Sequence, residues 1–86
     1  MRMKTLDYTV ATQGVYAASA NRLVNEAQQF KSSIMITSGV TVANMKSLFS
    51  VVAMGLKKGD KISIKVNGTD EDEAVESLKE YLSENV

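Results

Sequence analysis

The sequence predicts a two-layer sandwich of the α+β class, with helices packed on one face of a β-sheet. Segments in which apolar and polar residues alternate indicate strands with one buried face. Segments whose apolar residues lie three, four and seven apart indicate helices with a single apolar stripe. These segments follow one another in the order βαββαβα, and a half-polar sheet covered by one-sided helices makes two layers.

The first half of the chain contains a strand, a turn and a helix. Residues 4–11 are expected to form a strand, although Asp7 interrupts a clean alternation. Residues 13–15, with Gly14 at the centre, form the turn into a helix over 17–29. Its apolar face consists of Ala20, Leu23, Val24 and Ala27.

The middle of the chain is expected to form a hairpin and a short helix. Residues 33–37 and 41–43 read as two strands, joined across Ser38-Gly39-Val40. Ser47 then stands before a short apolar helical segment that ends near Gly55. A serine in that place is typical of a helix N-cap.

The last part is expected to form the clearest strand and a third helix. Residues 61–67 alternate strictly between apolar and polar side chains. Asp70 begins the next helix, where Asp70 and Glu73 are expected to form a capping pair. The apolar stripe of this helix consists of Ala74, Val75, Leu78 and Leu82, with Tyr81 at its margin.

Length and composition limit the function. The 86 residues suit one domain, 1–86, and 44% hydrophobic with 23% charged residues is ordinary for a globular protein. The formal net charge of zero argues against direct nucleic-acid or membrane binding. With no cysteine, no signal segment and no metal-ligand cluster, we expect a cytoplasmic protein without cofactor or metal.

The start of the first helix is a candidate functional position. The first backbone N–H groups of a helix lack intrahelical partners, so residues 16–19 surround a potential anion site. Nearly every helix has such an end. The side chains present must therefore decide the chemistry.

Four short stretches are informative together with the element order and the length. They are Gly14-Val15, Lys46-Ser47-Leu48, Met54-Gly55-Leu56 and the acidic segment 70–74. On these features, which run through essentially the whole chain, the sequence resembles the HPr family, the small phosphocarriers of the bacterial sugar phosphotransferase system. The resemblance implies an open-faced sandwich in which three helices cover one face of a four-stranded antiparallel sheet.

The phosphate site is where the sequence departs from the family. HPr proteins carry Gly-(Ile/Leu)-His-Ala-Arg-Pro-Ala, whereas residues 14–20 here read Gly-Val-Tyr-Ala-Ala-Ser-Ala. The former phosphate site is therefore Tyr16, Ala17, Ala18 and Ser19. A phenol with a pKa of about 10 suits reversible phosphoryl exchange poorly, and the chain contains no histidine. We expect no phosphohistidine carrier activity, and we interpret Tyr16 as a surface aromatic and Ser19 as a stabiliser of the first turn.

The resemblance also implies a regulatory site and a docking surface. Ser47 aligns with the serine that a dedicated kinase phosphorylates in many Gram-positive HPr proteins, and it also reads as a plain N-cap. The family's apolar docking patch corresponds here to Leu48 and Phe49, with Met54 at its border and Lys46, most simply a solvated charge, beside it. Adjacent helix positions differ by about 100°, so one of Leu48 and Phe49 should be exposed.

Three hypotheses for function follow. The first is a regulatory HPr-like protein of the phosphotransferase system, with roles in sugar-transport regulation and catabolite repression. Its partners would be an HPr serine kinase, a transcriptional regulator or phosphotransferase components. The second is a binding module repurposed for an unrelated partner through the altered surface at 16–19. The third, an enzyme, lacks support because no nucleophile and base pair or nucleotide motif is recognisable. The sequence leaves the oligomeric state open.

Overall fold

The computed structural model describes residues 3–86, and its elements follow the predicted order βαββαβα. The elements are β1 (Met3–Thr9), α1 (Ala17–Gln28), β2 (Ser33–Ser38), β3 (Thr41–Asn44), α2 (Leu48–Ala53), β4 (Lys61–Asn67) and α3 (Glu71–Asn85). Each predicted element is present, with its ends within about two residues of those expected. The predicted fold class is confirmed.

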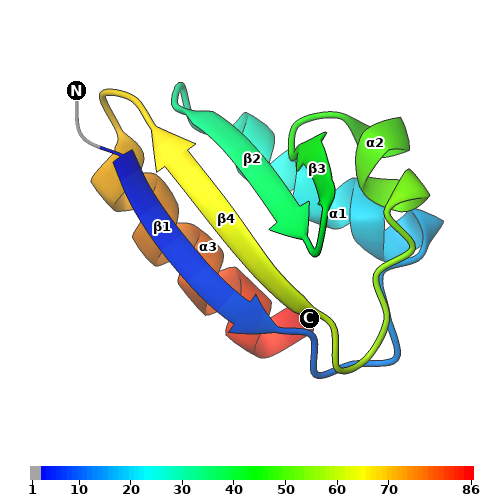
Figure 1. The fold of residues 1–86 in the computed structure, drawn as a ribbon. Coiled ribbons are helices and arrows are strands. Elements are labelled where there is room, and N and C mark those ends of the chain that lie inside the picture. Colours follow the sequence, from blue (N-terminus) through cyan, green and yellow to red (C-terminus); the bar gives the residue numbers. More distant parts are fainter. Residues whose placement is uncertain (1–2) are drawn as a thin grey trace.

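One four-stranded sheet contains all the strands, in the order β1-β4-β2-β3. Every pairing is antiparallel. β4 pairs with both β1 and β2 and therefore lies between them, although it is the last strand in sequence (Figure 1). The β2–β3 hairpin turns at Gly39 and Val40, since Ser38 pairs with Thr41. Gly39 has a φ of 62°, which a glycine adopts without strain.

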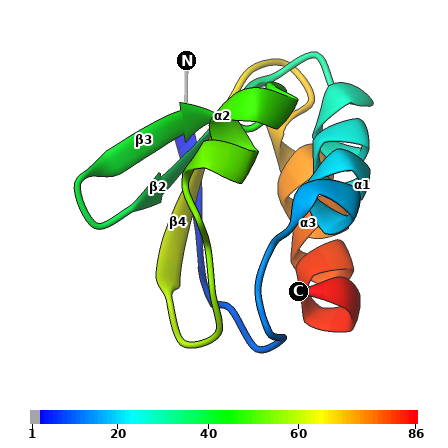
Figure 2. The same cartoon turned by 90° about the vertical axis from the view of Figure 1, so that its right-hand side faces the viewer.

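The helices lie on one face of this sheet and leave the other open (Figure 2). The core between the layers is built from the alternating side chains of the strands and from the predicted helix stripes. Asp7 does not interrupt this pattern: it is exposed on the open face, while its neighbours Leu6 and Tyr8 are half-buried against the core. The Tyr8 hydroxyl donates a 2.9 Å hydrogen bond to the carbonyl of Leu82, which ties β1 to α3.

The start of α3 differs from the prediction. Asp70 occupies the N-cap position but makes no side-chain cap hydrogen bond, so the predicted pair with Glu73 is wrong. Its carboxylate instead accepts hydrogen bonds from the backbone N–H groups of Lys31 and Ser32, at 2.8 and 2.9 Å, and from the Ser32 hydroxyl. The α1–β2 loop offers these three donors at close range, and they outcompete the helix end.

These bonds also change the acidity of Asp70. The hydrogen bond from the Ser32 hydroxyl, followed by that from the Lys31 N–H, stabilises the ionised carboxylate and holds the pKa of Asp70 below its ordinary value. Gly68 completes this corner, because a Cβ added there would lie 2.6 Å from the Cα of Ser32. The corner therefore joins two loops that are distant in sequence.

Within residues 3–86, every helix is too short or too polar to span a bilayer.

Candidate functional site

The turn before α1 is fixed by its backbone. The N–H of Val15 donates a 3.0 Å hydrogen bond to the carbonyl of Leu56, and Gly14 forms an isolated antiparallel bridge with Lys57. Gly14 has a φ of 145°, and a Cβ there would lie 2.7 Å from the Leu56 carbonyl oxygen. Both the conformation and the close approach require glycine. This turn sets where α1 begins, and Val15 is buried beneath it.

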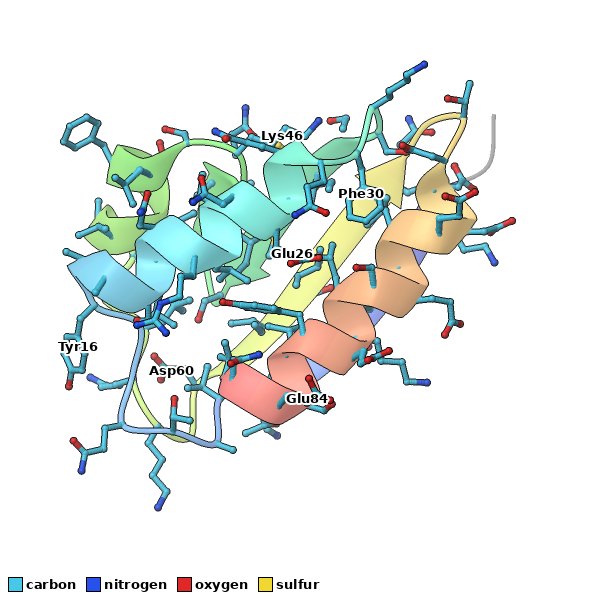
Figure 3. All side chains as sticks on the ribbon, turned by 180° about the vertical axis from the view of Figure 1, so that it is seen from behind. Tyr16, Glu26, Phe30, Lys46, Asp60 and Glu84 are labelled. Atoms are coloured by element: carbon cyan, nitrogen blue, oxygen red, sulfur yellow. The ribbon has the colours of Figure 1, made fainter. Side chains whose placement is uncertain are left out.

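The side chains at the start of α1 follow the sequence interpretation. Tyr16 is 64% exposed, at the N-terminal end of α1 (Figure 3). Ser19 holds the first turn: its Oγ accepts a 2.8 Å hydrogen bond from the Tyr16 N–H and donates one of 3.1 Å to the Tyr16 carbonyl. Ala17 and Ala18 are exposed and contribute no polar side-chain group. The predicted exposure of Tyr16 and the predicted role of Ser19 are confirmed.

This geometry offers little for phosphoryl transfer. The Tyr16 hydroxyl donates to the carbonyl of Gln13 at 3.4 Å, a long contact within its own turn. General-base activation of a hydroxyl needs a proton acceptor such as an imidazole or a carboxylate within hydrogen-bond reach. Within residues 3–86 the recorded partner of this phenol is that peptide carbonyl alone, which is a very weak base. Residues 16–19 thus form the start of a helix, and no general acid or base within residues 3–86 is hydrogen-bonded to the Tyr16 hydroxyl.

Ser47 lies at the N-cap position of α2 but does not cap it. Its N–H donates to the carbonyl of Asn44 at 2.9 Å, and its own carbonyl accepts from Val51 at 3.1 Å. Its side chain makes no cap hydrogen bond. The interpretation as a plain side-chain cap is therefore wrong, because backbone bonds alone organise this helix start. The half-buried Ser47 hydroxyl is free of hydrogen bonds to the rest of the described chain.

Lys46 is not the solvated charge expected from the sequence. Its ammonium donates a 2.6 Å hydrogen bond to the carbonyl of Phe30, just beyond α1 (Figure 3). The Gln28 side-chain amide donates to the Lys46 carbonyl at 3.0 Å, and the Lys46 N–H donates to Oδ1 of Asn44 at 2.9 Å. The C-terminal carbonyls of a helix attract a cation, which explains the position of the ammonium.

The apolar residues of α2 divide as the helix geometry requires. Leu48 is half-buried and packs against the core, whereas Phe49 is 86% exposed. Met54, the predicted border of the patch, is half-buried. Val52 is 37% exposed and was missed by the sequence analysis, although its position three residues after Phe49 places both on one helix face. Phe49 and Val52 are therefore the large exposed apolar side chains of α2.

The two stretches singled out in the sequence meet in space. α2 packs against α1, the loop before it is bonded to Gln28 and Phe30, and the segment after it is bonded to Val15. α2 therefore spans the region between the two ends of α1. Residues 16–19 lie at one end of this region, and the loop that carries Ser47 is attached to the other.

Two groups whose pKa is shifted lie on or before α3. Asp70 lies in the loop corner, and burial raises the pKa of the Tyr81 phenol on α3, an effect that Arg22 partly offsets. Among residues 3–86, no three carboxylate, imidazole or thiol groups are arranged to hold a metal ion. The features that remain are therefore an aromatic, a free hydroxyl and an apolar surface, which are suited to recognition.

Comparison with known proteins gives a consistent result. A family model described as the PTS HPr component phosphorylation site matches residues 7–84. The phosphocarrier protein HPr of Lysinibacillus sphaericus is 39% identical over 83 residues, covering 95% of this chain and 94% of the relative.

Two solved structures are similar over most of their lengths. The histidine-containing phosphocarrier protein of a Mycoplasma has a TM-score of 0.89 at 30% identity, covering 94% of this chain and 93% of that one. The Bacillus subtilis catabolite repression protein Crh, described as a swapped dimer, has a TM-score of 0.76 at 28% identity, covering 92% and 91%.

Proposed function

We propose that this chain, which belongs to the HPr family, has a regulatory role in the phosphotransferase system. It acts by binding other proteins and does not transfer phosphate through a phosphohistidine. The observation that carries this proposal is the side-chain set at the start of α1. The exposed Tyr16 stands where the family motif has histidine, and the hydrogen bond recorded for its phenol within residues 3–86 goes to a peptide carbonyl. The chain has no histidine elsewhere.

The proposed docking surface consists of Phe49 and Val52, with Leu48, Met54 and Lys46 around them. An exposed aromatic side chain can anchor an interface, especially when its backbone is rigid and an apolar neighbour helps to exclude water. The bonds of the Lys46 loop to Gln28 and Phe30 support such rigidity. This surface would bind phosphotransferase components or a transcriptional regulator.

Ser47 is the proposed regulatory phosphosite, with an HPr serine kinase as the enzyme that modifies it. Its hydroxyl makes no hydrogen bond within residues 3–86 that modification would break, and Ser47 immediately precedes the apolar residues of α2. A phosphate there adds a charge of about −1.5 to −2 and three acceptor oxygens beside the docking surface. The similarity to Crh, a protein whose name refers to catabolite repression, supports an output in that process.

The central test is incubation with phosphotransferase enzyme I and phosphoenolpyruvate, followed by mass spectrometry of the intact protein. A histidine-containing HPr serves as the positive control, and we expect this chain to remain unmodified. Stoichiometric, acid-labile phosphorylation would refute the loss of carrier activity.

A restoration experiment tests whether the docking surface remains. The triple variant Tyr16→His, Ala18→Arg, Ser19→Pro supplies the missing family residues on a helix start that Gly14 and Val15 already position. We expect it to accept phosphate, while the double variant Ala18→Arg, Ser19→Pro, which retains Tyr16, does not. A folded triple variant that stays unmodified would argue against a preserved docking surface.

The kinase test concerns Ser47 alone. We expect the HPr serine kinase and ATP to modify the wild-type chain but not Ser47→Ala, and the modified protein to bind a transcriptional regulator more tightly. Ser50→Ala is a matched control on the same helix. If the kinase modifies a control HPr but not this chain, the result would favour the second hypothesis, a binding module for an unrelated partner.

That second hypothesis is a binding module for an unrelated partner. The observation in its favour is the exposed, neutral surface of Tyr16, Ala17 and Ala18, where the family motif presents polar groups. If it is correct, replacing Tyr16 by Ala weakens partner binding, whereas replacing Phe49 by Ala leaves it unchanged. The regulatory proposal requires the opposite result.

A further inference from the structure

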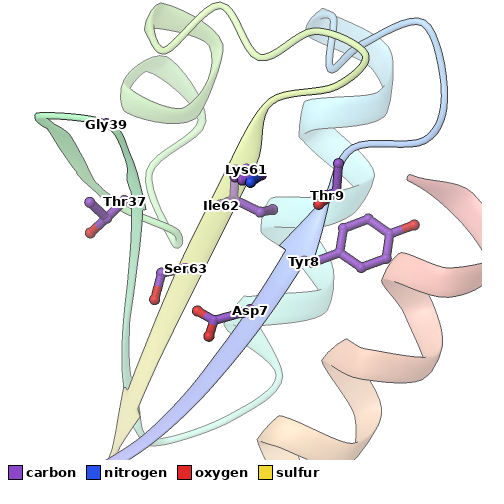
Figure 4. A pocket seen from close by; sticks show the side chains of 8 residues that line it. All are labelled: Asp7, Tyr8, Thr9, Thr37, Gly39, Lys61, Ile62 and Ser63. Atoms are coloured by element: carbon purple, nitrogen blue, oxygen red, sulfur yellow. The ribbon is translucent and has the colours of Figure 1, made fainter.

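The open face of the sheet contains a hollow of about 620 Å³. Polar side chains of β1, β2 and β4 line it, and Gly39 of the hairpin turn lies at its border; the polar residues are Asp7, Thr9, Thr37, Lys61 and Ser63. Figure 4 shows Asp7, Ser63 and Thr37 on the side of the sheet away from α3, while Tyr8 points toward α3. The hollow is therefore distinct from the candidate site on α1 and α2.

Opposite charges stand at two positions in this hollow. Asp7 pairs with Ser63 and Thr9 with Lys61, so Asp7 and Lys61 are diagonal neighbours on the same face of the sheet. Side chains in that relation start about 7–8 Å apart. Both residues are exposed, and within residues 3–86 neither side chain makes an ion pair or hydrogen bond. The hollow thus presents a separate negative and a separate positive pole.

Hydroxyl groups surround these two poles. Ser63 lies beside Asp7, Thr9 lies beside Lys61, and Thr37 pairs with Ser63 from the neighbouring strand. In the described part of the chain, the hydroxyls of these three residues have no hydrogen-bond partner. A hydroxyl both donates and accepts, so this set can bind an uncharged amide group between the poles.

We propose that this hollow binds a small zwitterion of dipeptide size, with its ammonium group at Asp7 and its carboxylate at Lys61. Two residues of extended chain span about 7 Å, which is close to the spacing of the two backbone positions from which the Asp7 and Lys61 side chains start. The peptide group then lies between the hydroxyls of Ser63 and Thr9, which flank the diagonal from Asp7 to Lys61. A simple anion or cation fits less well, because each is repelled by one pole while it is attracted by the other.

The test uses dialanine as the probe and ¹⁵N–¹H NMR of the wild-type protein. N-acetyl-dialanine, which lacks the ammonium group, and dialanine amide, which lacks the carboxylate, are matched probes. We expect dialanine to shift the amide resonances of the strand residues that line the hollow and those of Gly39. Each matched probe should bind about fivefold more weakly, the upper range for losing one exposed ion pair.

Variants separate charge recognition from general surface binding. Asp7→Asn and Lys61→Gln should each weaken dialanine binding about fivefold. Lys65→Gln is the control, since Lys65 faces the same side of β4 but does not line the hollow. The double exchange Asp7→Lys, Lys61→Asp should restore binding. It keeps one negative and one positive side chain in the hollow, and the dipeptide then binds in the reversed direction.

Three results would overturn the proposal. They are the absence of shifts with dialanine in the millimolar range, equal shifts with all three probes, and shifts centred on α1 or α2. Intact resonances outside the hollow show that each variant is folded. This inference is independent of the proposed regulatory function, because the experiment requires neither phosphorylation nor a protein partner.

Discussion

The two ends of α1 are fixed in different ways. At the N-terminal end, Gly14 and Val15 are held by backbone bonds to the segment after α2, and the exposed side chains Tyr16, Ala17 and Ala18 contribute little. Beyond the C-terminal end, side chains from other elements bind the backbone of the loop. Lys46 binds the carbonyl of Phe30, and Asp70 binds the N–H groups that follow it.

This difference explains how the side chains at 16–19 can differ from the histidine-containing family motif without loss of the fold. The backbone bonds of Gly14 and Val15 do not depend on the side chains at 16–18, so histidine and arginine can be absent there while the helix start remains. At position 19 the hydroxyl of Ser19 itself holds the first turn. A loop that depends on specific charged side chains has no such freedom. We therefore expect substitutions at the two ends to act differently on stability.

The largest effect is expected at the backbone-fixed end. Gly14→Ala combines an unfavourable φ with a clash against the carbonyl of Leu56, and should lower the free energy of unfolding by about 3 kcal/mol. Gly55→Ala is the control, since Gly55 has a φ of 62° but open space at its Cβ, and should cost about 1 kcal/mol. Urea denaturation measures both. Equal costs would show that the close approach is unimportant.

The next effect is expected in acid, at the loop fixed by Asp70. The pKa of Asp70 is lower in the folded protein than in the unfolded chain, so its contribution is present above the unfolded value and is lost as pH falls through the folded one. Thermal unfolding between pH 7 and 2 should therefore show a smaller acid-induced fall in Tm for Asp70→Asn than for wild type. Glu76→Gln, an exposed control on α3, should follow the wild-type curve.

Lys46 offers a test by charge removal. Lys46→Met keeps most of the aliphatic chain but removes the hydrogen bond to Phe30, and should lower the free energy of unfolding by about 1 kcal/mol. Lys58→Met removes an exposed lysine that has no ion pair or hydrogen bond in the described chain, so it should change stability by less than about 0.5 kcal/mol. A negligible difference between the two would show that the ammonium does not fix the loop.

The smallest effect is expected for Ser47, compared with the serine at the start of α1. Ser19→Ala removes a hydroxyl that binds the Tyr16 N–H and should cost about 1 kcal/mol. Ser47→Ala removes a hydroxyl without such a bond and should cost less than about 0.5 kcal/mol. Chemical denaturation of both variants decides the matter. An equal loss for Ser47→Ala would reinstate it as a side-chain cap.

Sequence reasoning succeeded where the signal is local. The elements and the helix stripe of Leu23 and Val24 follow from periodicity, and the exposure of Phe49 follows from helix geometry. The strand order could not be read from periodicity, because the pairing of Met3 with Asn67 depends on chain-wide packing.

The errors at the site have the same origin. Asp70 and Lys46 were assigned from their immediate neighbours, but their hydrogen-bond partners are Ser32 and Phe30, which lie in another part of the chain. Ser47 was read as a side-chain cap because its residue type favours that role, and the backbone turn from Asn44 made the side-chain bond unnecessary. Residue type predicts what a group is able to bond. The tertiary fold decides which bond it makes.

The central position of β4 determines when the sheet can form during synthesis. Translation delivers the chain from its N-terminus at roughly 5–20 residues per second, so β1 leaves the ribosome long before its partner. Of the pairings in the described sheet, the β2–β3 hairpin alone can form before residues 61–67 appear. Until then Leu6 and Tyr8 have no sheet or α3 to cover them. β1 therefore has no strand partner in the nascent chain until β4 is available, and the sheet is complete only when β4 has paired with both β1 and β2.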